Sequence, residues 1–282
     1  MQTYASAGLR SPHMAHRMRL ARPMDPACTG KTLASLLSMA LVVLCLASSQ
    51  VGAAGVGTHP NLNGTWAVYP SRTKGPPPDP KLLAPPPGPL KLKAKYAQPY
   101  EAMRAAQRES DRKGEPLANA STECIPNGMP TMMFPIYPLE ILQTPGQVTI
   151  IAEAMSQVRR IYLDVPQAKI DEVPPGYFGH SVGHWEGNTL VVDTIGVKEE
   201  VLGYRDTPHS DQMHIRERFH LVAPDVLHDE ITVEDPVTLE QPWTYTFAYK
   251  HTPGYQMLEY VCDNNREYVD DKGVTRMRLQ NH

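Results

Sequence analysis

The side chains best suited to proton transfer gather in one stretch of the chain, residues 179–219. Histidines and carboxylates there lie between or within β-like runs, and both kinds of group can exchange protons during catalysis. Loops that are carried on rigid strands often hold functional groups. The stretch therefore predicts acid/base chemistry. The candidate catalytic residues are Glu217, His184, His180, His209 and Asp211.

Glu217 is the most informative of these residues because it lies in an alternating run. In residues 213–222, apolar side chains occupy the face that also carries Glu217, and this face is predicted to be the core face. An unpaired charge in an apolar environment is costly. We therefore expect Glu217 either to pair with a buried arginine or a tyrosine, or to hold its proton and act as a general acid or base.

Two other kinds of site have weaker support. His180 and His184 point to one side of a strand, and with nearby aspartates they could bind a divalent cation. Ser181 or Ser210 could act as a nucleophile, but no triad order is evident around either serine. The cysteines and histidines lack the CxxC and HExxH spacings of zinc sites. We predict no metal and no cofactor.

Aromatic residues near the C-terminus predict the wall of a cavity. If residues 243–249 pair with residues 256–262, Trp243 and Tyr245 face the same side as Tyr260. Rings that carry hydroxyl groups suit an apolar ring system held by a few polar contacts. An ordinary filled β-core is the alternative. The candidate substrate-binding residues are Trp243, Tyr245, Tyr260, Phe219 and Arg266.

Short apolar runs separated by turn-forming residues predict a mainly β fold. The runs lie at residues 149–154, 158–163, 189–197, 213–222, 226–233, 243–249 and 256–262. Pairing across Ala223, Pro224 and Asp225 places the apolar face of one run opposite that of the next, with Glu217 facing Ile231. We predict an antiparallel calycin-like β-barrel or, failing that, a sandwich.

The N-terminal part of the mature chain is predicted to cover this barrel. The protein has 28 prolines, and their density in residues 70–89 predicts an extended strap, because proline removes a donor and fixes φ. Residues 100–113 are alanine-rich and charged, which predicts one surface helix. We assign the N-terminal strand, strap and helix to residues 54–123 and the barrel core to residues 124–282, as one domain.

Residues 1–53 are predicted to be a secretory signal peptide. Basic residues precede an apolar run at 32–47, and small residues follow it, which is the pattern of an export signal. A membrane anchor is the alternative, but about 16 apolar residues are short for a bilayer span. Translation from a later methionine, such as Met24, leaves the prediction of a periplasmic or secreted location unchanged.

Export changes the interpretation of the cysteines. Removal of the signal leaves Cys124 and Cys262, an even pair in an oxidising compartment. We predict a disulfide between them, and two separate buried thiols are the alternative.

Composition excludes several partners. The chain has 282 residues, 41% hydrophobic and 20% charged, enough to bury one sizeable core. Without residues 1–53 it has 22 basic and 29 acidic residues, a net charge of −7. An acidic body without a basic stripe is a poor match for nucleic acid or for an anionic membrane. We therefore expect no nucleic-acid partner and no stable membrane insertion after signal cleavage.

Four motifs taken together resemble a large family of uncharacterised exported bacterial proteins. They are GHSVGHWEGNTLVVDT, PHSD followed by ERF, EDP before PW, and EYVCDNNR, and they span Asn61 to Arg266. Asn188 stands where the family has aspartate, and Asp263 where it has glutamate. The resemblance implies export but no activity. A second resemblance, carried by Gly64, Thr65 and Trp66, is to the GxW strand of lipocalin-type barrels.

These features predict an exported β-barrel that binds a small, largely apolar or aromatic molecule. Acid/base catalysis without a cofactor, such as elimination, isomerisation or hydration, is one form of this hypothesis. A carrier without chemistry is the first alternative, and a structural envelope protein with a filled barrel is the second.

Overall fold

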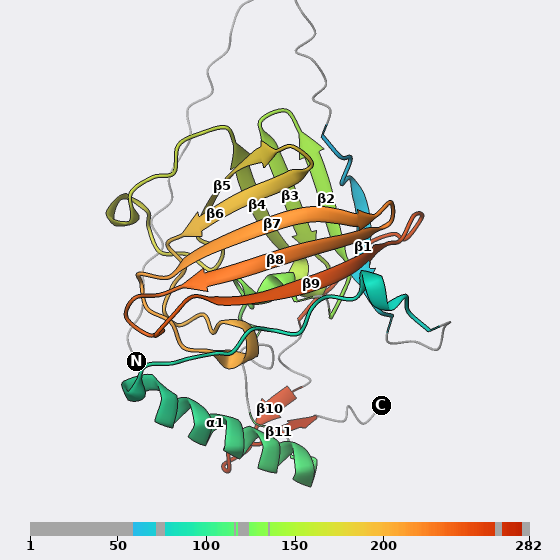
Figure 1. The fold of residues 1–282 in the computed structure, drawn as a ribbon. Coiled ribbons are helices and arrows are strands. Elements are labelled where there is room, and N and C mark those ends of the chain that lie inside the picture. Colours follow the sequence, from blue (N-terminus) through green and yellow to red (C-terminus); the bar gives the residue numbers. More distant parts are fainter. Residues whose placement is uncertain are drawn as a thin grey trace, which may run out of the picture. The chain divides into compact units, whose positions relative to one another are not determined.

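A computed structural model describes residues 59–71, 77–115, 117, 124–134, 136–262 and 267–277, without the side chains of residues 267, 268, 275 and 277. All of them belong to one unit, Gly57–His282. In this described part of the chain, nine strands form a closed barrel, and two short strands form a separate hairpin (Figure 1). The predicted signal peptide, residues 1–53, lies outside the described residues.

The elements follow the chain in a simple order. The barrel strands are β1 Gly64–Val68, β2 Leu139–Thr144, β3 Gln147–Ala152, β4 Gln157–Leu163, β5 His180–Glu186, β6 Thr189–Ile195, β7 His214–Ala223, β8 Val226–Glu234 and β9 Trp243–His251. The hairpin is β10 Glu267–Val269 and β11 Thr275–Met277, and the α-helix is α1 Ala94–Lys113. Short 3-10 turns lie at Pro80–Leu82, Thr131–Met133, Ala154–Ser156, Ile170–Glu172 and Tyr204–Asp206.

The prediction of a mainly β barrel with one surface helix is confirmed for the described residues. Each strand pairs with the next one along the chain, and β1 pairs with β9 to close the barrel. One pair differs from the antiparallel expectation, because β4 and β5 run parallel through three residue pairs. A parallel pair needs a long crossover, which residues 164–179 provide.

The predicted register between β7 and β8 is confirmed. Glu217 lies opposite Ile231, and Phe219 lies opposite Asp229. Both faces therefore alternate as the sequence indicated, with Ile215, Glu217 and Phe219 inside the barrel. The two acidic side chains on this face, Glu217 and Asp229, are both completely buried.

The predicted hairpin between residues 243–249 and 256–262 is wrong. Residues 255–262 form no strand, and the second edge of β9 is occupied by β1, with Trp66 opposite His251 and Val68 opposite Tyr249. Tyr260 consequently does not face Trp243. The strand that closes the barrel comes from the other end of the chain, which pairing of sequence neighbours does not predict.

Gly64 and Trp66 explain how β1 fits between β2 and β9. Gly64 has a φ of +122°, and a Cβ atom there would lie 2.6 Å from the His251 ring, so only glycine fits. The Trp66 side chain is buried, and its indole N–H donates a hydrogen bond of 2.9 Å to the Leu62 carbonyl oxygen. The GTW sequence therefore has a structural role at the closure of the barrel.

One end of the barrel is filled by residues 124–134, which we call the plug. Its methionines Met129, Met132 and Met133 are buried in the core. The backbone N–H of Met129 donates to the Tyr177 carbonyl, and the hydroxyl of Tyr249 on β9 donates to the Met133 carbonyl. The plug is thus fastened to the barrel wall by main-chain groups as well as by apolar packing.

The helix and the strap lie on the outside of the barrel. α1 begins six residues earlier than predicted, at Ala94, and ends as predicted before Gly114, whose φ of 69° suits a helix C-cap. Arg104 of α1 forms an ion pair of 2.7 Å with Asp206. The strap runs past β9, where Gly88 exchanges hydrogen bonds with Thr244 and with the Trp243 indole N–H. No described helix is long and apolar enough to cross a membrane.

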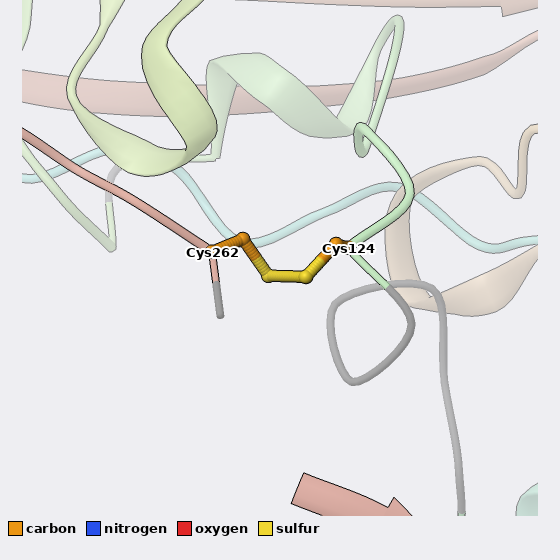
Figure 2. Close-up of a disulfide and its surroundings, with 2 residues drawn as sticks. All are labelled: Cys124 and Cys262. Carbon is orange, nitrogen blue, oxygen red and sulfur yellow. A yellow bond between two sulfur atoms is a disulfide. The ribbon is translucent and has the colours of Figure 1, made fainter. Parts of the chain in front are cut away.

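The predicted disulfide joins the plug to the segment after β9. Figure 2 shows the bond between Cys124 and Cys262, whose Cα atoms are 5.6 Å apart across 138 positions of sequence. Because residues 255–262 are not part of the sheet, this covalent link holds them beside the barrel end.

Replacing both cysteines by serine, C124S/C262S, is expected to lower the free energy of unfolding by about 2–5 kcal/mol, because the bond restricts a long loop in the unfolded chain. Urea denaturation measures the change. The wild-type protein in reducing agent is the control and should match the variant. An unchanged midpoint in both would contradict the structural role of the bond.

Candidate functional site

The centre of the barrel holds a buried ion pair. Arg159 of β4 is 1% exposed and Glu217 of β7 is 0% exposed. The guanidinium group contacts both carboxylate oxygens, with an Nη1–Oε1 distance of 2.8 Å. A bidentate arginine–carboxylate pair is a strong charge-assisted interaction. The sequence left open whether Glu217 is paired or holds a proton, and the structure shows it paired with a buried arginine.

Two hydroxyl groups complete the environment of Arg159. Its Nε donates to the Ser181 Oγ at 3.1 Å, and its Nη2 donates to the Thr194 Oγ1 at 2.9 Å. Ser181 lies in the spacing Gly179–x–Ser181–x–Gly183, which is that of a nucleophile elbow. It lies within a strand, however, and its hydroxyl is buried against Arg159 and Thr194. Ser181 is therefore part of the ion-pair network rather than an exposed nucleophile.

Arg159 is a central residue that the sequence analysis missed. It precedes Arg160 in an otherwise apolar run, QVRRIYL. Successive residues of a strand point to opposite faces, so one of two neighbouring arginines must point inward. That signal was present in the sequence, and it identifies the partner of Glu217.

The predicted catalytic residues are not brought together. His180 and His184 lie on the outer face of β5, because the intervening Ser181 points inward. The His180 ring contacts the Gln167 side chain at 2.8 Å, and His184 is exposed beside Glu186. The structure therefore does not bring either histidine to Glu217 inside the barrel.

His209 and Asp211 also lie away from Glu217. The His209 ring is buried, and its nitrogens contact the backbone carbonyl oxygens of Ser210 and Val201 at 2.9 and 2.5 Å. Asp211 is exposed, and its backbone N–H donates to Glu199. The structure therefore does not bring these residues into a common site with Glu217.

The PHSD and EDP motifs meet in one loop structure. Asp235 accepts hydrogen bonds from the backbone N–H of Ser210 at 2.6 Å and from the Ser210 hydroxyl at 2.9 Å. It also accepts from the backbone N–H groups of Val237 and Thr238. Burial raises the pKa of Asp235, but these hydrogen bonds outweigh it and lower the pKa below its usual value. The two motifs thus stabilise the connections at one end of β7 and β8.

The aromatic residues of β9 form a packed cluster. The Tyr245 ring lies 4.7 Å from Trp243 and 5.3 Å from Phe247, measured between centroids. Tyr204, from the loop before β7, contacts all three rings and also Phe134 of the plug. Phe219 is buried in the same core. Trp243, Tyr245 and Phe219 therefore form part of a filled core, which was the alternative to a cavity wall.

Two polar side chains inside this core lack protein partners. Neither carboxyl oxygen of Asp229 has a hydrogen bond to any described residue, and the same is true of the Tyr245 hydroxyl. Burial, and then the negative charge of Glu217, raise the pKa of Asp229 well above its usual value, although Arg159 opposes the shift. Burial and the nearby Asp229 also raise the pKa of Tyr245. The raised pKa of Asp229 favours its neutral, protonated form inside the barrel.

A cavity of about 260 Å³ lies between the plug and the inner ends of β2, β3 and β4. Most side chains that line it are apolar or aromatic, and a few are uncharged polar groups. The lining residues are Asn127, Thr131, Met132, Phe134, Ile136, Tyr137, Leu139, Ala152, Ala154, Met155, Gln157 and Tyr260. Among the predicted substrate-binding residues, Tyr260 lines this cavity, whereas Arg266 lies outside the described residues.

Unfavourable backbone conformations and hydrogen bonds shape the part of the cavity that Met155 and Tyr260 line. Met155 and Ser156 both have positive φ values, 56° and 49°, which are unfavourable for residues other than glycine. The Ser156 hydroxyl donates to the Tyr260 carbonyl, and Glu153 accepts from the Tyr255 hydroxyl and from the Leu258 backbone N–H. These contacts hold the segment after β9 against the turn between β3 and β4.

Comparisons with known proteins identify no relative. No profile of a protein family matches the chain, and a search of curated proteins finds no significant match.

Removing one partner of the central ion pair is expected to destabilise the fold strongly. Arg159→Met and Glu217→Met should each lower the free energy of unfolding by about 3–5 kcal/mol, because the other group stays buried without its partner. The double variant R159M/E217M should lose less than the sum of the two. Arg218→Met, in an exposed pair with Glu186, is the control and should cost about 0–1 kcal/mol. Additive losses would contradict the pairing.

The neutral Asp229 predicts a pH dependence of stability. Its folded pKa is raised, so the folded state keeps a proton that the unfolded chain loses above a pH of about 4. Wild-type stability relative to Asp229→Asn should therefore fall as pH rises from 4 toward neutrality, by at most about 1.4 kcal/mol per pH unit. Urea denaturation at several pH values measures this difference. A difference that is independent of pH would show that Asp229 does not hold a proton.

Proposed function

We propose that this protein binds a small, uncharged, largely apolar ring compound in the cavity beside the plug. The observation that carries the proposal is the cavity of about 260 Å³, whose lining, as far as the structure describes it, includes no charged side chain. Ligand sites are typically concave and apolar with a few polar groups that orient the ligand. An ionised ligand would lose its hydration here without gaining a counter-ion.

Two tyrosine side chains that line the cavity favour a flat ligand. Tyr137 and Tyr260 meet edge to face, with ring centroids 5.7 Å apart, and both line the cavity. Aromatic pairs of this kind offer large apolar surfaces and polarised edges to a bound ring. Met132 and Met155 line the same space, and the flexible thioether side chain of methionine adapts to ligands of different outline.

Binding without chemistry is the form of the hypothesis that we favour. Glu217 is neutralised by Arg159, and the histidines that were expected to share its site lie elsewhere. The cavity lining contains no histidine or carboxylate among its described residues. A carrier or a binding protein requires neither group. A purely structural barrel is less favoured, because a filled barrel predicts no cavity, whereas this one has a cavity of about 260 Å³.

Export is part of the proposal. The disulfide between Cys124 and Cys262 supports it, because such bonds persist mainly in oxidising compartments. The N-terminal pattern of basic, apolar and small residues supports it independently. Location in the periplasm or outside the cell would place the protein where it meets environmental small molecules.

Binding of a neutral aromatic probe tests the proposed function. N-phenyl-1-naphthylamine should gain fluorescence on binding to the wild-type protein. Ala154→Trp, at the cavity wall, should weaken binding at least about tenfold by filling the space. Val165→Trp is the control, because Val165 is exposed and does not line the cavity, and it should leave the affinity unchanged. Equal affinities for all three proteins would exclude this cavity as the site.

A further inference from the structure

The orphaned polar atoms of Asp229 and Tyr245 need an explanation beyond packing. A buried polar group without a hydrogen bond costs about 1–3 kcal/mol, and native proteins satisfy most of them with protein groups, water or ligands. Here three such atoms belong to two inward-facing side chains on the neighbouring strands β8 and β9. Asp229 lies opposite Phe247, and Tyr245 is two residues from Phe247 on the same face.

A short chain of aromatic contacts connects these atoms to the cavity. Phe134 lines the cavity, and its ring lies 5.4 Å from the ring of Phe247. The Phe247 ring in turn lies 5.3 Å from the ring of Tyr245. Phe134 and Phe247 therefore both lie between the apolar cavity and the Tyr245 ring. The Phe134 side chain belongs to the plug and is only partly buried, whereas Phe247 belongs to β9.

We propose that the cavity and the pair Asp229–Tyr245 are two parts of one ligand site, joined when the Phe134 and Phe247 side chains turn aside. This inference rests on the proposed function, and it adds a chemical class: an uncharged ring compound with one hydroxyl or carbonyl group. The ring occupies the cavity, and the polar group reaches the carboxylic acid of Asp229 and the hydroxyl of Tyr245. Both can donate a hydrogen bond to a carbonyl oxygen, and both can accept one from a hydroxyl.

The remaining polar groups of the barrel favour this assignment. Arg159 and Glu217 satisfy each other, and Ser181 and Thr194 are occupied by Arg159. The hydroxyl of Tyr249 is occupied by the Met133 carbonyl. Asp229 and Tyr245 are thus inward polar residues with unused hydrogen-bonding capacity, and they lie beside the ring of Phe247. A charged ligand group would meet no free counter-ion among the described residues there.

Two matched probes test the inference. The affinities of naphthalene and 2-naphthol, which differ by one hydroxyl group, are measured by displacement of N-phenyl-1-naphthylamine. The wild-type protein should bind 2-naphthol about tenfold more tightly, the value of one hydrogen bond to a buried group. Tyr245→Phe and Asp229→Leu should each reduce this preference at least about threefold without weakening naphthalene binding.

Two further variants complete the design. Tyr162→Phe removes a hydroxyl from the outer face of the barrel and should keep the full preference. Phe134→Ala should accelerate association of 2-naphthol, because it removes one of the two side chains that separate the two parts. Equal wild-type affinities for the two probes, or a preference that survives both interior variants, would overturn the inference while leaving the proposed function intact. If neither probe binds, the proposed function itself fails, and the inference with it.

Discussion

The barrel depends on one electrostatic constraint, the pairing of Arg159 with Glu217 at its centre. Two charges removed from water are tolerated only when each satisfies the other and the remaining hydrogen-bonding capacity is used. Ser181 and Thr194 meet that requirement for the guanidinium group. The pair links β4 to β7, on either side of the parallel junction between β4 and β5, where the ladder has only three residue pairs.

The same pair influences the rest of the interior. Burial, and then the negative charge of Glu217, raise the pKa of Asp229 well above its usual value, which favours its neutral form. Asp229 and Tyr245 therefore bring unpaired polar atoms to the aromatic cluster of β9. The described part of the barrel thus combines a satisfied charge pair, an unsatisfied polar pair and an apolar cavity.

Local alternation was enough to predict part of this arrangement. The inward position of Glu217, the register of β7 with β8 and the end of α1 at Gly114 all follow from interactions close in sequence. The closure of β9 by β1 and the plug do not, because they join segments separated by more than 100 residues. The structure places the other candidate catalytic residues away from Glu217, because nearness in sequence does not imply nearness in space. Strand alternation alone separates His180 and His184 from Glu217.

The cavity was not predicted because three separate segments build it: the plug, the turn at Met155 and the segment that carries Tyr260. Only the disulfide indicated that two of them meet. A crystal structure of the mature protein soaked with N-phenyl-1-naphthylamine would show directly whether the cavity binds a small ring compound. We predict electron density for the probe among Met132, Tyr137 and Tyr260. Density confined to the outer face of the barrel, with the cavity empty, would contradict it.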